Sequence, residues 1–182
     1  MEIKLITKLE DKSLLLQLRD LLILGDQEFI PPLSSRSSTT QQGLGAAEGG
    51  GIDLYFNEMK TQCFVLALEG DRLAGFMSFK LDHRGAHVPQ AKNLYASTSV
   101  VHPDFRGRGL MTAFYREMLA AYPDRPIYTR TWHENFGHLK VLERLGFTLT
   151  ELLPNHRGEG IHTVYYCHKP YYLCKESTKE TL

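Results

Sequence analysis

The chain lacks an excess of charge of either sign. Its 21 Lys and Arg residues balance 21 Asp and Glu residues, and its isoelectric point is near 7.1. A protein that holds nucleic acid or an anionic membrane by bulk electrostatics normally shows a basic excess or a basic tract. We therefore expect no nucleic-acid partner and no membrane partner. Any anionic ligand must be held by a local group of residues.

Cysteine and long apolar runs are also scarce. Three cysteines are an odd number and too few to staple 182 residues, so we expect a reducing compartment and a cytoplasmic location. The first residues, MEIKLITKLEDK, carry charges and no long apolar segment, and the later run LLLQLRDLLILG is interrupted by Gln17, Arg19 and Asp20. We expect neither a signal peptide nor a membrane span.

The length and composition fit one folded unit. With 182 residues, of which 42% are hydrophobic, the chain is expected to form a single domain over 1–182. Residues 34–51 change to SSRSSTTQQGLGAAEGGG, which is too rich in Ser, Thr and Gly to form a regular element. This segment is predicted to be a flexible internal loop, and residues 172–182 a disordered tail.

The spacing of apolar residues predicts a mixed sheet with helices. Alternating patterns indicate strands over 1–7, two strands within 63–83 that join at Gly70-Asp71, and further strands over 94–101, 126–131, 147–153 and 161–168. Helical spacing indicates helices from Asp11 or Ser13 to Leu24, and over 52–60, 107–121 and 135–145. The strand, helix and strand of 94–131 require a right-handed parallel crossover, whereas the other strand pairs are antiparallel hairpins. We expect an α+β fold with a mostly antiparallel sheet of about seven strands.

A glycine-containing turn follows the strand over 94–101. In VHPDFRGRGLMT, Gly107 and Gly109 allow successive backbone N–H groups to point the same way, and the following helix N-terminus adds about half a positive charge. Such a turn can hold a pyrophosphate. It lacks the Lys-Ser/Thr of a P-loop and the third glycine of a dinucleotide fingerprint. An ordinary turn with two solvated arginines, Arg106 and Arg108, is the alternative interpretation.

This turn resembles the pyrophosphate motif of the GNAT superfamily of acetyl-CoA-dependent N-acetyltransferases. That motif is Q/R-x-x-G-x-G/A after a strand that ends in V-x-P. The matching residues in this sequence are Val101, Pro103, Arg106 and Gly109. Met111 stands where the family usually has a final Gly or Ala.

A second segment, NFGHLKVLERLGF, is similar to the GNAT motif N-x-x-A-x-x-L-Y-x-K-L-G-F. The residues that match at the family's spacing are Asn135, Leu145, Gly146 and Phe147, with Arg144 in place of Lys. His138 takes the position of the Ala, Val141 that of the Leu and Leu142 that of the Tyr. The two motifs occur in the family's order, and each lies on the expected unit of strand and helix.

The resemblance implies a fold in which the central parallel strands splay apart and helices cover both faces of the sheet. The arm of acetyl-CoA is then expected between those strands. Ser99, Val100 and Val101 are expected to offer backbone groups to this arm and to the thioester carbonyl, and Asn135 to approach it. The residues expected to hold the pyrophosphate are Arg106, Gly107, Arg108, Gly109, Leu110, Met111 and Thr112. No metal site is expected.

The catalytic residues are less clearly indicated. A general base must deprotonate the acceptor amine, and His133, which follows the 126–131 strand, is the foremost candidate, with Glu134, Asp82, His83 or a water relay as alternatives. Leu142 stands where the family's proton-donating tyrosine is usual. The candidates to replace that tyrosine are Tyr166, Tyr165 and Tyr115. The thiolate of CoA can also leave without a proton.

The leading hypothesis is an acyltransferase that moves an acetyl group from acetyl-CoA to a primary amine by direct attack on the thioester. The acceptor can be a small molecule or a peptide, and a homodimer is a possible assembly. The alternative is a non-catalytic module that binds CoA or regulates another protein. The missing tyrosine, the unassigned base and Met111 are the features that keep this alternative open.

Overall fold

The fold is a seven-stranded mixed sheet with helices on both faces, seen in a computed structural model that describes residues 1–44 and 50–170. The strands are β1 Glu2–Ile6, β2 Cys63–Glu69, β3 Arg72–Leu81, β4 Leu94–Val101, β5 Ile127–Trp132, β6 Thr148–Leu153 and β7 Thr163–His168. The helices are α1 Lys12–Gly25, α2 Ile52–Met59, α3 Leu110–Ala121 and α4 Phe136–Arg144, with short 3-10 turns η1 Asp26–Glu28, η2 Leu33–Ser35 and η3 Pro103–Phe105. Residues 45–49 of the predicted loop and the predicted tail over 172–182 lie outside the described residues.

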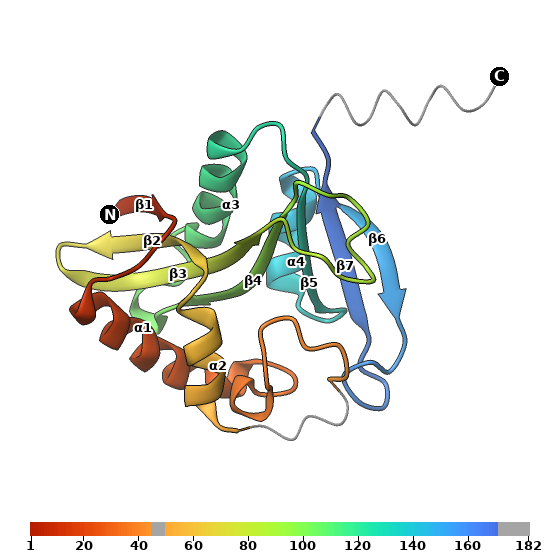
Figure 1. The fold of residues 1–182 in the computed structure, drawn as a ribbon, viewed down its shortest axis with the longest axis horizontal. Coiled ribbons are helices and arrows are strands. Elements are labelled where there is room, and N and C mark those ends of the chain that lie inside the picture. Colours follow the sequence, from red (N-terminus) through yellow and green to blue (C-terminus); the bar gives the residue numbers. More distant parts are fainter. Residues whose placement is uncertain (45–49, 171–182) are drawn as a thin grey trace.

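The strand order in the sheet is β1-β2-β3-β4-β5-β7-β6. Among the seven strands of the described residues, β4 and β5 are the one parallel pair, and the other neighbouring pairs are antiparallel. The helix α3 makes the crossover between the two parallel strands, which confirms the predicted mixed sheet and its central βαβ unit (Figure 1).

The two parallel strands stay paired for only three positions. Leu94, Tyr95 and Ala96 pair with residues 127–129, and no pairing continues beyond Ala96. At the same point the β3–β4 register shifts, because Ser78 pairs with Thr98 while Phe79 pairs with Ala96. Ser97 is therefore an extra residue on β4, and a bulge of this kind bends its strand and increases its twist. The bulge turns the second half of β4 away from β5 and opens the sheet between them.

Alternate residues of the strands bury against helices on opposite faces. On β2, Val65 packs in a core with α3 and α4, whereas Phe64 and Leu66 pack in a second core with α1 and α2. Both cores are closed to solvent at their centres, as at Phe114 of α3 and Leu22 of α1, which have 0% exposed surface. The two layers of helices fix the sheet from both sides (Figure 1).

The main difference from the predicted elements is at the start of α3. The sequence pattern predicts this helix from residue 107, but it begins at Leu110. Gly107 and Gly109 have φ angles of +75° and +76°, which no residue inside a right-handed helix adopts. These residues form a turn that delays the helix by three residues.

No helix in residues 1–44 and 50–170 is both long and apolar enough to cross a membrane.

Gly75 of β3 lies directly behind the part of β4 that borders the opening. A Cβ atom at this position would lie 2.9 Å from the Val100 carbonyl oxygen and 3.2 Å from the Val101 Cα. Gly75→Ala is therefore expected to lower the free energy of unfolding by about 1–3 kcal/mol, because backbone atoms of β4 would have to move. Urea unfolding followed by circular dichroism measures the change.

Gly43→Ala is the matched control, because its added Cβ would meet no atom within 4 Å and its φ is not positive. An unfolding free energy for Gly75→Ala equal to that of Gly43→Ala would contradict the close packing assigned to β3 against β4.

Candidate functional site

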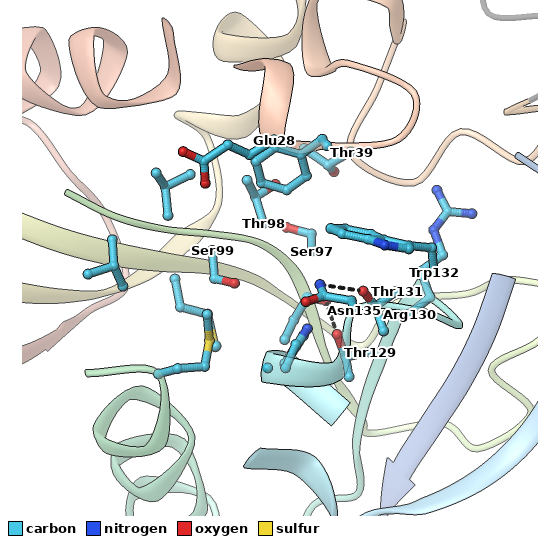
Figure 2. A pocket seen from close by; sticks show the side chains of 18 of the residues that line it. Glu28, Thr39, Ser97, Thr98, Ser99, Thr129, Arg130, Thr131, Trp132 and Asn135 are labelled. Carbon is cyan, nitrogen blue, oxygen red and sulfur yellow. Dashed lines mark hydrogen bonds between the residues drawn. The ribbon is translucent and has the colours of Figure 1, made fainter. Parts of the chain in front are cut away.

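A cavity of about 270 Å³ opens between β4 and β5 where the two strands diverge. Figure 2 shows Ser97, Thr98 and Ser99 along β4 on one side, and Thr129, Thr131 and Trp132 along β5 on the other. The remaining lining residues come from β4 and β5 themselves, from the segments around η1 and η2, from β3, from the turn before α3, from α3 and α4 and from the β6–β7 loop. They are Glu28, Phe29, Arg36, Thr39, Met77, Ala96, Val100, Val101, Arg106, Met111, Tyr115, Arg130, Asn135, Gly137, His138 and Arg157.

The free edge of β4 is one wall of this cavity. The His102 N–H donates to the Ala74 carbonyl of β3, so by the alternation of an antiparallel ladder Val100 also faces β3. The backbone groups of Ser99 and Val101 then face the opening. In agreement, the Val101 carbonyl accepts a hydrogen bond at 3.1 Å from Arg106 Nε and not from a neighbouring strand. An extended ligand can use these backbone groups as a missing strand would.

The turn before α3 leaves room for a ligand beside its backbone. Cβ atoms built on Gly107 and Gly109 would meet no protein atom within 4 Å, so glycine is needed there for its positive φ and not for packing within the protein. Gly109 is the N-cap of α3 and makes no side-chain cap hydrogen bond. The first N–H groups of a helix have no acceptor within the helix, so those of Leu110, Met111 and Thr112 can bind an anion.

The two arginines of this turn are held in place by carboxylates. Arg106 Nη2 lies 2.7 Å from Glu28 Oε1, and Arg108 Nη1 lies 3.5 Å from Glu69 Oε1. The Arg108 guanidinium also lies over the Phe105 ring, with its Cζ 5.0 Å from the ring centroid. Both arginines keep about half of their side-chain surface exposed, so they can contribute to an anion in the turn.

The family assignment follows from the sequence model of the acetyltransferase (GNAT) family, which matches residues 35–147. This match spans more than half of the chain and includes the turn, β4, β5, α3 and α4. The chain belongs to the GNAT acetyltransferase family. Curated protein sequences give no match at a significant level.

Solved structures agree with a GNAT fold. The aminoglycoside 6'-N-acetyltransferase from Enterococcus faecium is 18% identical, with a TM-score of 0.63 over 92% of this chain and 96% of that chain. An aminoglycoside 6'-N-acetyltransferase complexed with coenzyme A is 18% identical, with a TM-score of 0.64 over 92% and 96%. The yncA structure from Salmonella typhimurium, with its cofactor acetyl-CoA, is 13% identical, with a TM-score of 0.63 over 92% and 93%. At these identities the likeness shows the fold.

The structure brings part of the predicted GNAT cofactor set together at the cavity. Ser99, Val100, Val101, Arg106, Met111 and Asn135 line it directly. Gly107, Arg108, Gly109, Leu110 and Thr112 lie next to it in the turn and the first turn of α3. The Asn135 side chain, at the N-cap of α4, donates from Nδ2 to Thr131 Oγ1 at 2.9 Å (Figure 2).

The two predicted catalytic residues are not among the lining residues. The His133 ring stacks on His162 with centroids 4.5 Å apart, and its Nδ1 accepts from the His162 backbone N–H at 3.2 Å. Tyr166 of β7 packs against the core formed with α3 and α4. Leu142, at the GNAT tyrosine position, is fully buried in the same core. Of the alternative bases, Asp82 pairs with Arg125 at 3.0 Å, and His83 packs beside Tyr95.

Tyr115 and His138 form a pair in the wall of the cavity. Tyr115 of α3 is buried, and its hydroxyl lies 2.8 Å from His138 Nε2 on α4. Burial raises the pKa of Tyr115 and lowers the pKa of His138 to about 4, so both groups are neutral at pH 7. The GNAT motif has Ala where His138 stands, and the sequence spacing alone gives no sign that these two side chains meet.

Three arginines of the cavity wall were not among the residues predicted for a site. Arg36 lies in the segment predicted as a flexible loop, Arg130 lies on β5, and Arg157 lies in the β6–β7 loop. In sequence, Arg36 is 94 positions from Arg130 and 121 from Arg157, and Arg130 is 27 positions from Arg157. No local motif therefore joins the three arginines. The one local signal concerns Arg130 alone, which is a charged residue within a mostly buried strand.

The low pKa of His138 predicts a dependence of stability on pH. The unfolded chain binds a proton at this histidine near pH 6.5, whereas the folded protein binds it only near pH 4. The stabilisation is therefore complete above about pH 6.5 and is lost as the pH falls towards 4. The expected loss is about 1–3 kcal/mol in the free energy of unfolding, measured by urea titration at several pH values.

His138→Gln is the comparison, because an amide can still bond the Tyr115 hydroxyl but does not titrate. The other histidines and the carboxylates contribute equally to both proteins. Parallel stability curves for the wild type and His138→Gln between pH 6.5 and 4 would contradict the lowered pKa and the neutral state of His138.

Proposed function

We propose that the protein is an N-acetyltransferase that transfers an acetyl group from acetyl-CoA to a primary amine by direct attack on the thioester. The observation that carries this proposal is the opening between β4 and β5, with a free strand edge at one side and a glycine turn at the head of α3 beside it. Membership of the GNAT family supports the acyltransferase chemistry. A cytoplasmic location belongs to the same proposal.

The cofactor fits the residues present. The turn offers the N–H groups from Gly107 to Thr112, two arginines, and open space where Cβ atoms would project. Ser99 and Val101 offer their backbone groups along the free edge of β4, and Asn135 faces them from α4. Acetyl-CoA bound there supplies an acetyl group activated as a thioester.

The chain's own groups then have two tasks. An N–H at the β4 edge, from Ser99 or Val101, stabilises negative charge on the carbonyl oxygen during attack. The acceptor amine must also lose a proton, because an amine with a pKa of about 10.4 is neutral only about once in several thousand molecules at pH 7. A carboxylate, a histidine or a chain of water molecules can take this proton.

A non-catalytic CoA-binding module is the second candidate. It is favoured by Leu142, which occupies the usual tyrosine position and is fully buried. Tyr115 lines the cavity but is itself buried and engaged with His138. Under this candidate CoA binds, whereas no amine is acetylated.

Thiol release from acetyl-CoA across a broad panel of primary amines separates the two candidates. We expect saturable, amine-dependent release of CoA thiol together with an acetylated product detected by mass spectrometry. Tight CoA binding without turnover on any amine would favour the binding module, and absence of CoA binding would contradict both.

Gly109→Val tests the position of the pyrophosphate. The added side chain projects into the open space beside the turn and disfavours the positive φ, so we expect at least about a hundredfold weaker CoA binding by calorimetry. Gly160→Val is the matched control, because Gly160 has a φ of +74° and equally open surroundings but lies in the β6–β7 loop. Equal CoA affinity in the two variants would overturn the assignment of the turn.

A further inference from the structure

The cavity contains more positive charge than its carboxylates balance. Its charged lining residues are four arginines and one carboxylate, Glu28, and Glu28 is paired with Arg106. The other three arginines are Arg36, Arg130 and Arg157. In the described part of the chain, the arginines that form ion pairs are Arg19, Arg72, Arg106, Arg108 and Arg125, and none of these three is among them.

Each of the three arginines is held by neutral acceptors only. Arg36 donates from Nε and Nη2 to the Pro31 carbonyl at 3.0 and 2.6 Å. Arg130 donates to the Gln41 carbonyl at 2.6 Å and to the Tyr165 hydroxyl at 3.3 Å. The third, Arg157, donates to Thr163 Oγ1 at 2.9 Å and to the Ile30 carbonyl at 2.5 Å. These bonds fix the guanidinium groups, but none of them is an ion pair with a carboxylate.

Carboxylates on neighbouring segments are engaged elsewhere. Asp26 accepts from the backbone and hydroxyl of Ser34, both at 2.7 Å. Glu58 pairs with Lys80 at 2.6 Å, and Glu151 lies 2.6 Å from His87 Nδ1. The chain therefore places no counter-ion among the three arginines in its described residues.

Such an arrangement is costly unless something else compensates it. Arg36 and Arg157 are only 5% and 6% exposed, and removing an unpaired guanidinium from water costs several kcal/mol. Burial, together with repulsion from Arg36 and Arg130, lowers the pKa of Arg157. An anion that binds among the three groups would remove this penalty, since guanidinium forks match carboxylate and phosphate oxygens.

We propose that Arg36, Arg130 and Arg157 bind an anionic group, a carboxylate or a phosphate, on the acceptor amine. This inference rests on the proposed function, because it assigns the acceptor end of the same cavity. The arginines lie at the end formed by the 30–44 segment and the β6–β7 loop, whereas the glycine turn lies at the N-terminus of α3. Phe29 and Trp132 provide apolar walls. The Arg36 Cζ lies 5.6 Å from the centroid of the Phe29 ring. The proposed acceptor is therefore a small molecule that carries both a primary amine and a carboxylate or phosphate group.

Matched acceptors that differ only in the anion test the preference. The pairs are β-alanine with β-alaninamide and O-phosphoethanolamine with ethanolamine, assayed by thiol release from acetyl-CoA. We expect kcat/KM to be at least about tenfold higher for the anionic member of one pair than for its neutral member. The pair that shows this difference identifies whether the arginines recognise a carboxylate or a phosphate. Spermidine, a polycation, is expected to be a poor acceptor. Equal or higher kcat/KM for the neutral members of both pairs would overturn the proposal.

Variants separate anion binding from a purely structural role of the arginines. In Arg157→Gln, the ratio of kcat/KM for the anionic acceptor to kcat/KM for its neutral counterpart is expected to fall towards one. Arg157→Lys is expected to retain part of this preference. Arg125→Gln is the matched control, because it also removes one guanidinium but one that pairs with Asp82 outside the cavity. A lower melting temperature for Arg157→Gln with an unchanged acceptor preference would show that the arginine only holds the loops together.

Binding of simple anions tests the site without turnover. If no amine is acetylated although CoA binds, the transfer proposal fails, but the anion site is still measured by titrating the CoA-saturated protein with malonate and with inorganic phosphate. We expect a saturable rise in melting temperature for the wild type with one of these anions, and none for Arg157→Gln. No rise in the wild type, or the same rise in both proteins, would overturn the anion site.

Discussion

The whole site depends on the loss of hydrogen bonding between β4 and β5 after Ala96. A central strand with an unpaired edge would normally be costly, because its N–H and C=O groups need partners. Here the bulge at Ser97 turns β4 away from β5 at the position where pairing stops, and the sheet remains intact on both outer sides. The unpaired edge of Ser99 and Val101 is thereby directed into a cavity where an extended ligand can complete it.

The other parts of the site are arranged around this opening. The crossover from β4 to β5 passes through α3, so the N-terminus of α3 and its glycine turn lie next to the end of β4. The helix α4 follows β5 directly and brings Asn135 and His138 to the opposite wall. The far end of the cavity is formed by chain segments distant in sequence, which Arg130 and Arg157 connect through bonds to the carbonyls of Gln41 and Ile30.

Most of the fold could be predicted from local patterns. Within the described residues, alternation and helical spacing identified each strand and main helix, and the β4 bounds agree with the structure, because each element places its apolar residues at a regular spacing. The glycine turn proposed to hold the cofactor was also predictable, since glycine favours the positive φ angles found at residues 107 and 109. The pairing of Tyr115 with His138 and the convergence of Arg36, Arg130 and Arg157 could not be predicted. They arise from contacts between segments whose distances in sequence follow no local period.

The most direct test of the account is residue-resolved hydrogen exchange of the backbone amides of β4 with and without CoA, followed by NMR. If the CoA arm pairs with the free edge, the amides of Ser99 and Val101 should exchange much more slowly in the complex. The amide of Val100, which already faces β3, should change little. Saturating CoA that leaves Ser99 and Val101 unchanged would contradict the central claim that the opening between β4 and β5 is the cofactor site.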